Sequence, residues 1–97
     1  MRMIQMMVII LKGENKFYIE NDGQNVAEIT FVPSGNKRLI IDHTFVDPQL
    51  RGQRVGEALV EKVVEYAREG NKTIIPLCPF AKRQFDQKKE YVDVLEK

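Results

Sequence analysis

The sequence predicts one α/β (α+β) domain: a meander of about four antiparallel strands, a strand–helix–strand unit and a short final helix. Three observations predict this fold class. Apolar, β-branched stretches alternate with turn-forming residues through the first half of the chain. Apolar residues then recur at helical spacing after Arg54, and another apolar, β-branched stretch follows that helix. At 97 residues the chain has the size of a single domain, residues 1–97.

The first half of the chain is expected to form the meander. Its apolar stretches place strands at residues 7–11, 17–19, 26–32 and 38–46, with glycine-containing turns between them. Side chains alternate between the two faces of a strand. In the fourth strand this alternation predicts one face formed by Leu39, Ile41, His43 and Phe45, and the other by Asp42 and Thr44.

The second half is expected to form a right-handed βαβ unit. Asp47 and Pro48 end the fourth strand, and the helix runs from Gln53 to about Glu69 with an apolar buried stripe. Residues 72–77 then form a strand parallel to the fourth one, and Pro76 indicates that this strand diverges or lies at an edge. Residues 80–89 form a short helix, and residues 90–95 a tail that packs through its apolar residues.

The composition excludes several classes of partner. Fifteen Lys and Arg residues are spread among 14 acidic ones, so no nucleic-acid-binding face is predicted. No metal site is predicted either. The apolar run at residues 3–11 is far shorter than the roughly 20 residues that cross a bilayer, so no membrane partner is expected. The lone Cys78 allows no intrachain disulfide, which makes the cytoplasm the expected location. Four glutamates at helical spacing, residues 57–69, are interpreted as a solvated face, with a docking ridge for a basic partner as the alternative.

The loop before the helix is a candidate anion site. The first amides of a helix lack intrahelical partners and lie at the positive end of its dipole, so they bind phosphate well. Arg51 and Arg54 add charge, while Gly52 and Gly56 allow a ligand close to the backbone. A plain strand-to-helix turn with solvated arginines is the alternative. If the two parallel strands diverge, the backbone of the fourth strand near its end is left unpaired, and the site suits a diphosphate attached to an amide chain.

Residues 51–56 (Arg-Gly-Gln-Arg-Val-Gly), between a strand and a helix, resemble the acetyl-CoA pyrophosphate loop of the GCN5-related N-acetyltransferase (GNAT) family, whose pattern is Gln/Arg-x-x-Gly-x-Gly/Ala. Arg51 and Gly56 match the ends of this pattern, and Arg54 replaces its first glycine. Residues 13–91 also resemble the small single-domain members of the family, which lack the usual early helices. The matching segments are residues 15–17, 27–29, 43–44, 67–69 and 76–80.

The resemblance implies a GNAT-like fold and the binding of acetyl-CoA or CoA, with pantetheine along the end of the fourth strand and the diphosphate on the amides of residues 53–56. We expect cofactor contacts at Phe45, Val46, Arg51, Gly52, Gln53, Arg54, Val55, Gly56, Phe80 and Arg83. The resemblance also points to His43 and Cys78 as catalytic residues. It implies acetyl transfer to an unknown amine or protein acceptor. Because the early helices are absent, the acceptor side of the pocket is expected to be open, so either the acceptor lies across it in a monomer or a second protomer completes it in a homodimer.

Two mechanisms are compatible with these residues. Cys78 ends a strand just before Pro79 and a helix start, where the positive helix end and Arg83 would stabilise a thiolate. The helix that usually carries the family's tyrosine acid has Phe80 and Phe85, which favours acetyl transfer through Cys78 over direct transfer with His43 as base. A buried, inert cysteine is the alternative reading of Cys78. For the whole chain, the alternative is a non-catalytic module that binds CoA or acyl-CoA as a sensor or partner protein.

Overall fold

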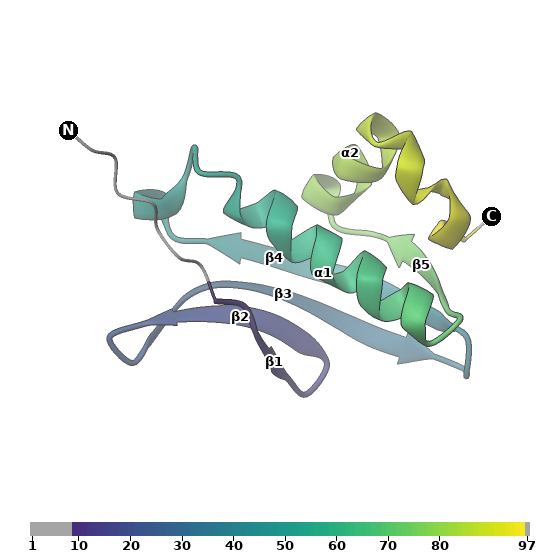
Figure 1. Cartoon of the computed structure of the whole chain (residues 1–97), viewed down its shortest axis with the longest axis horizontal. Helices are drawn as coiled ribbons and strands as arrows, with labels where there is room; N and C mark the ends of the chain where they lie inside the picture. Colours follow the sequence, from purple (N-terminus) through teal and green to yellow (C-terminus); the bar gives the residue numbers. More distant parts are fainter. Residues whose placement is uncertain (1–8, 97) are drawn as a thin grey trace.

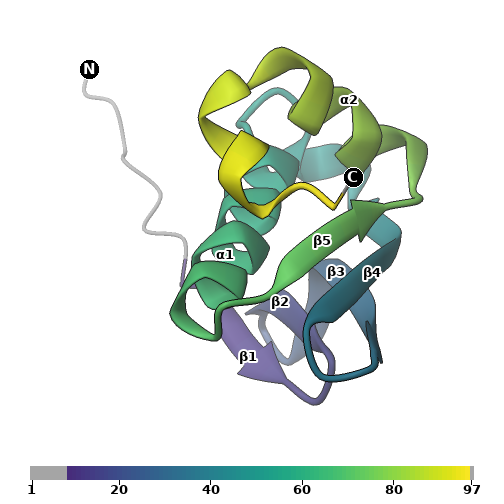
Figure 2. The same ribbon diagram turned by 90° about the vertical axis from the view of Figure 1, so that its right-hand side faces the viewer.

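The computed structural model describes residues 9–96 as one five-stranded sheet with two α-helices on the same face (Figures 1 and 2). The strands are adjacent in chain order, and β1 to β4 are antiparallel whereas β5 is parallel to β4. The predicted meander followed by a βαβ unit is therefore confirmed. The elements are β1 (Leu11–Gly13), β2 (Lys16–Asn21), β3 (Gln24–Ser34), β4 (Arg38–Val46), η1 (Pro48–Leu50), α1 (Val55–Glu69), β5 (Thr73–Pro76), α2 (Pro79–Gln87) and η2 (Lys89–Val94).

A two-residue turn, Asp22 and Gly23, joins β2 to β3. Both residues have positive φ, 54° and 78°, and Asn21 pairs with Gln24 across them. Two consecutive residues in this conformation twist the chain as neighbouring strands require, so the turn sets the register of the hairpin. That register places Phe17 and Ile19 on the buried face of β2, as their spacing predicts.

The core lies between the sheet and α1. Seven residues of α1 are buried: Val55, Gly56, Leu59, Val60, Val63, Val64 and Ala67. Tyr66 is only partly buried, and its ring packs on Phe17 and Phe31 with centroids 5.8 and 5.6 Å away. The helix thus lies on the sheet through an apolar face, which anchors its N-terminus beside the end of β4 (Figure 1).

The chain after β5 folds back onto α1. Ala81 and Phe85 of α2 are buried, and residues 90–95, predicted as a packing tail, form the 3₁₀ helix η2 with Tyr91 and Val94 buried. Arg68 on α1 holds this segment through two hydrogen bonds of 2.9 Å to the Asp93 carboxylate. These hydrogen bonds lower the pKa of the Asp93 carboxyl.

One prediction about β4 is wrong because the strand contains a β-bulge. Thr30 of β3 pairs with His43, but the next residue, Phe31, pairs with Ile41, so Asp42 is an extra residue in β4. Beyond the bulge the alternation is inverted. Thr44 pairs with buried Ile29 and faces the helices, whereas His43 is exposed on the opposite face.

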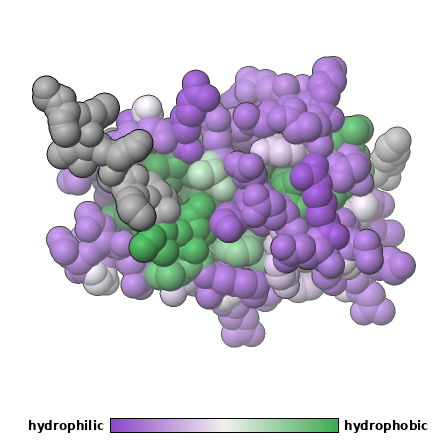
Figure 3. Space-filling model, in the orientation of Figure 1, coloured by the Kyte–Doolittle hydropathy of each residue, from purple (hydrophilic) through white to green (hydrophobic). Residues whose placement is uncertain are grey.

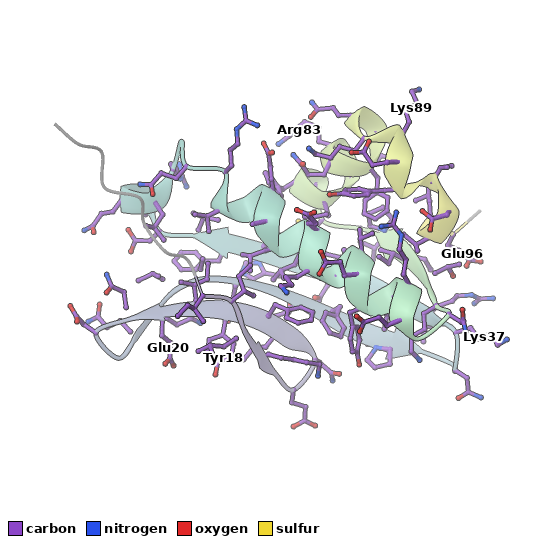
Figure 4. The ribbon with its side chains drawn as sticks, viewed as in Figure 1. Tyr18, Glu20, Lys37, Arg83, Lys89 and Glu96 are labelled. Atoms are coloured by element: carbon purple, nitrogen blue, oxygen red, sulfur yellow. The ribbon has the colours of Figure 1, made fainter. Side chains whose placement is uncertain are left out.

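The inverted alternation also sends Phe45 to the face of the sheet that α1 does not cover. Phe45 pairs with Glu28, which pairs in turn with Tyr18, and directly paired residues share a face. Figure 4 shows Tyr18 and Glu20 pointing away from α1 on this outer face. His43 and Phe45 therefore do not share a face with Leu39 and Ile41.

Several predicted boundaries shift. Part of the strand predicted at 7–11 lies outside the described residues, and the described strand begins only at Leu11. The strand predicted at 26–32 continues to Ser34, with Pro33 paired to Leu39. Helix α1 begins at Val55 instead of Gln53, since Arg54 is in the left-handed conformation. The strand predicted at 72–77 and the helix predicted at 80–89 become β5 and α2, each within one or two residues of its expected ends.

The described surface is mostly polar on the face that carries the helices. Figure 3 shows apolar side chains in smaller areas between the polar ones, one at the left of the centre and one at the right. Ile9, which is 65% exposed, is the most exposed large apolar side chain described. None of the helices within residues 9–96 combines the length and the apolar character needed to cross a membrane.

Candidate active site

The site begins where β4 and β5 separate. Their pairing runs only from Arg38 opposite Thr73 to Ile41 opposite Pro76. The amides of Leu77 and Cys78 then both donate to the Ile41 carbonyl, at 3.0 and 3.1 Å. From that carbonyl onward the two chains diverge, as the proline predicts, and the rest of β4 runs without a partner on this side.

A cavity of about 670 Å³ opens beside the end of β4. The residues that line it come from β4, from the loop that precedes α1, from the first turn of α1 and from α2. They are Thr44, Val46, Leu50, Arg51, Gly52, Arg54, Val55, Gly56, Glu57, Phe80 and Arg83. The continuous segment from the end of β4 to the first turn of α1 therefore meets α2 at the free edge of β4.

The N-terminus of α1 points its backbone amides at this cavity. Arg54 precedes the helix with φ 61° and ψ 29°, and its side chain makes no capping hydrogen bond. The first α-helical hydrogen bond runs from the Ala58 amide to the Arg54 carbonyl at 3.1 Å. Within the described part of the chain, the amides of residues 55–57 have no acceptor. Amides without acceptors at the positive end of a helix dipole are groups that favour an anionic ligand.

The charge at the cavity is positive. Arg51, Arg54 and Arg83 line it, and none of them is ion-paired within residues 9–96. The one lining carboxylate, Glu57, lies 3.7 Å from the ammonium of Lys88. Figure 4 shows Arg83 projecting from α2 toward the side of the loop that precedes α1. An anionic ligand would therefore meet three guanidinium groups and a carboxylate that is already compensated.

Gly56 lines the cavity and also has a packing role. A Cβ built on Gly56 would come within 2.8 Å of the Phe80 ring. The glycine therefore lets α2 pack closely on the start of α1, and the ring of Phe80 becomes a wall of the cavity. Gly52 has a φ of 85°, which favours glycine, and no atom of the described chain lies within 4 Å of a Cβ built on it.

Cys78 lies just behind the cavity. Its thiol is buried, with 8% of the residue exposed, and it is the N-cap residue of α2. The Cys78 Sγ is 3.3 Å from the hydroxyl oxygen of Thr44, which does line the cavity. The thiol is thus connected to the cavity through a side chain on the opposite strand.

Most of the predicted site residues come together. Eight of the ten expected cofactor contacts line the cavity; Gln53 lies outside the lining set, and the side chain of Phe45 is on the outer face. Of the two expected catalytic residues, Cys78 is adjacent to the cavity and His43 lies across the sheet from it. The expectations missed Thr44, Leu50 and Glu57. Leu50 and Glu57 flank the predicted loop, so they could have been predicted from the sequence. The position of the Thr44 side chain depends on the bulge in β4, which the sequence does not show.

Comparisons with known proteins identify the family. The model of the family described as GCN5-related N-acetyl-transferase matches residues 16–94. The chain belongs to this family. The GNAT assignment covers every strand from β2 to β5 and both α-helices, and therefore the whole of the cavity described above.

The relatives agree with this GNAT assignment. A solution structure of a GCN5-like protein from Staphylococcus aureus is 44% identical, with a TM-score of 0.78 over 92% of this chain and 88% of that one. An uncharacterized N-acetyltransferase of Methanocaldococcus jannaschii is 30% identical over 71% of this chain, which spans only 34% of that relative's length. N-acetylglutamate synthase from Neisseria gonorrhoeae, solved with coenzyme A and N-acetyl-glutamate, shares only the fold. It is 19% identical, with a TM-score of 0.62 over 75% of this chain and 18% of that one.

Proposed function

We propose that this GNAT domain binds acetyl-CoA and transfers the acetyl group to an amine through an acetylated Cys78. One observation carries the proposal: the free edge of β4 meets the uncapped N-terminus of α1 in one arginine-lined cavity of about 670 Å³. A cavity of that size suits an extended cofactor. Its combination of unpaired strand, helix amides and arginines suits a ligand with amide groups at one end and phosphates at the other.

The proposed cofactor orientation follows from these groups. The diphosphate lies on the amides of residues 55–57, with Arg51 and Arg54 beside it. The pantetheine amides pair with the backbone of β4 near Val46, where β5 has already diverged. This direction leads the thioester toward Thr44 and Cys78 at the other end of the cavity.

The chemistry at Cys78 proceeds in two steps. Sγ of Cys78 bonds to the carbonyl carbon of acetyl-CoA, the bond from that carbon to the CoA sulfur breaks, and CoA leaves as its thiol after taking up a proton. The amine then attacks the acetylated Cys78, loses a proton and releases the cysteine thiol. In the direct alternative, with His43 as base, the amine would have to approach from the outer face of the sheet, where His43 lies.

The test measures intact mass after incubation with acetyl-CoA. The wild-type chain is expected to gain one acetyl group and the Cys78→Ala variant none. In parallel, titration with CoA is expected to shift the amide resonances of residues 53–57. Equal acetylation of the two proteins would contradict the covalent route, and unchanged resonances at saturating CoA would contradict cofactor binding altogether.

A second function is favoured by the low exposure of Cys78. At 8% exposure the thiol is poorly accessible, and the tyrosines of the described chain are absent from the cavity lining. Both features fit a module that binds CoA or acyl-CoA without turnover. That function predicts CoA-induced shifts at residues 53–57 with no acetyl transfer to the protein or to a panel of primary amines.

A further inference from the structure

Thr44 occupies a position that the proposed reaction has to use. The bulge at Asp42 directs the Thr44 side chain toward the helices, where its hydroxyl oxygen lies 3.3 Å from Sγ of Cys78. Either atom can be the donor in this hydrogen bond. The bond crosses the gap between β4 and the end of β5, just past the last main-chain hydrogen bonds between them.

The hydroxyl lies between the thiol and the space available to a ligand. Thr44 lines the cavity, whereas Cys78 itself is buried behind it. A hydroxyl carries one proton and two lone pairs, so it can hydrogen-bond to two sulfur atoms at the same time. A thioester that reached Cys78 from the cavity would pass beside this hydroxyl.

We propose that Thr44 relays the proton of the Cys78 thiol to the departing sulfur of CoA, a step that rests on the proposed function. As Sγ bonds to the acetyl carbon, the thiol proton moves to the Thr44 oxygen. The Thr44 hydroxyl proton moves to the CoA sulfur as its bond to the acetyl carbon breaks. The products are the acetylated cysteine and CoA thiol, and Thr44 is regenerated without a change in total charge.

The histidine and the tyrosines of the described chain pack elsewhere or face the other side of the sheet. His43 is exposed on the outer face, and Tyr18 shares that face. Tyr66 packs between phenylalanines on the far part of α1, and Tyr91 packs on Phe85 with ring centroids 5.4 Å apart. Within residues 9–96, the side chain that is hydrogen-bonded to Sγ of Cys78 is that of Thr44. The relay therefore takes the place of a tyrosine acid.

The test compares Thr44→Val, which removes the hydroxyl at nearly constant shape, with Thr44→Ser, which keeps it. Stopped reactions with acetyl-CoA are followed by intact mass to obtain the rate of Cys78 acetylation. Thr44→Val is expected to acetylate about 100-fold more slowly than wild type, as for the loss of other general acid–base groups. The acetylation rate of Thr44→Ser is expected to stay within about fivefold of the wild-type rate, because serine keeps the hydroxyl but holds it less firmly.

A second acetyl donor separates proton relay from mere positioning. A nitroaryl thioester releases a thiolate that needs no proton, because a strongly acidic thiol is a good leaving group. With this donor the aryl thiolate leaves unprotonated and the proton of the Cys78 thiol passes to water, so no proton has to reach the leaving sulfur. The deficit of Thr44→Val is therefore expected to shrink at least about tenfold. A deficit of equal size with both donors would mean that Thr44 only positions the thiol, and the relay would be wrong.

The controls keep the two proposals apart. Thermal unfolding and titration with CoA test whether Thr44→Val folds and binds CoA. If Thr44→Val does not fold, Thr44→Ala removes the same hydroxyl with a smaller side chain. Wild-type rates in the Val or Ala variant would overturn the relay and leave Cys78 acetylation standing. A wild-type chain that binds CoA but takes no acetyl group would overturn both proposals.

Discussion

Arg54 is expected to reduce folding stability while it strengthens cofactor binding. Its φ of 61° and ψ of 29° lie in the left-handed region, where a residue with a Cβ is strained by about 1–2 kcal/mol. Glycine removes that strain, but it also raises the conformational entropy of the unfolded chain, which lowers the free energy of unfolding by roughly 0.4–1 kcal/mol. The Arg54→Gly variant should therefore gain about 0.5–1 kcal/mol in free energy of unfolding, which corresponds to a Tm higher by about 2–8 °C.

The same substitution removes one of the three guanidinium groups at the cavity. Arg54 is exposed, so its attraction for a phosphate is screened by water and salt. CoA affinity should fall about tenfold at low ionic strength, with a smaller loss at high ionic strength. Two matched variants separate the effects. Arg54→Lys keeps the charge and the strain, whereas Arg54→Asn removes the charge and tolerates the left-handed conformation.

The assays are urea unfolding without ligand and calorimetric titration with CoA at two salt concentrations. We expect stability to rise in the Gly and Asn variants and to stay level in the Lys variant, with affinity lost in the first two and kept in the third. A less stable Arg54→Gly chain would refute the assignment of backbone strain. Tighter CoA binding by Arg54→Gly would show that the arginine obstructs the phosphate loop.

Three further predictions concern residues around the site. Gly56→Ala should force the Phe80 ring into the cavity and weaken CoA binding, and a Gly56→Ala/Phe80→Leu double variant should recover it in the same titration; no recovery would contradict the contact. Gln84 is buried with a side-chain oxygen that has no partner in the described chain, so Gln84→Leu should raise the free energy of unfolding by about 1 kcal/mol in urea. Burial, and then the Glu61 carboxylate, raise the pKa of Tyr91. The protonated phenol therefore stabilises the folded chain fully below about pH 10, where tyrosine titrates in the unfolded chain. This stabilisation is lost as the pH rises through the higher pKa of the folded chain. Tyr91→Phe should flatten the alkaline fall in Tm, and an unchanged slope would refute this cause.

The loop that we propose to bind phosphate follows from local sequence. Arg51, Gly52 and Arg54 lie in consecutive positions before a helix whose apolar period is clear, and a helix start always carries unpaired amides. The divergence of β4 and β5 also has a local cause, since Pro76 ends the ladder. The proposed cofactor loop and the free strand edge could therefore be predicted from the sequence.

The sequence by itself determined the order of strands and helices, the loop at the start of α1 and the cysteine at the end of β5, because periodicity, turn residues and proline act on their own neighbours. Tertiary structure decided which β4 side chain meets that cysteine. The bulge at Asp42 depends on pairing with β3, a contact between distant segments, and a shift of one residue exchanges the two faces of a strand. It moved His43 away from the site and brought Thr44 to the thiol.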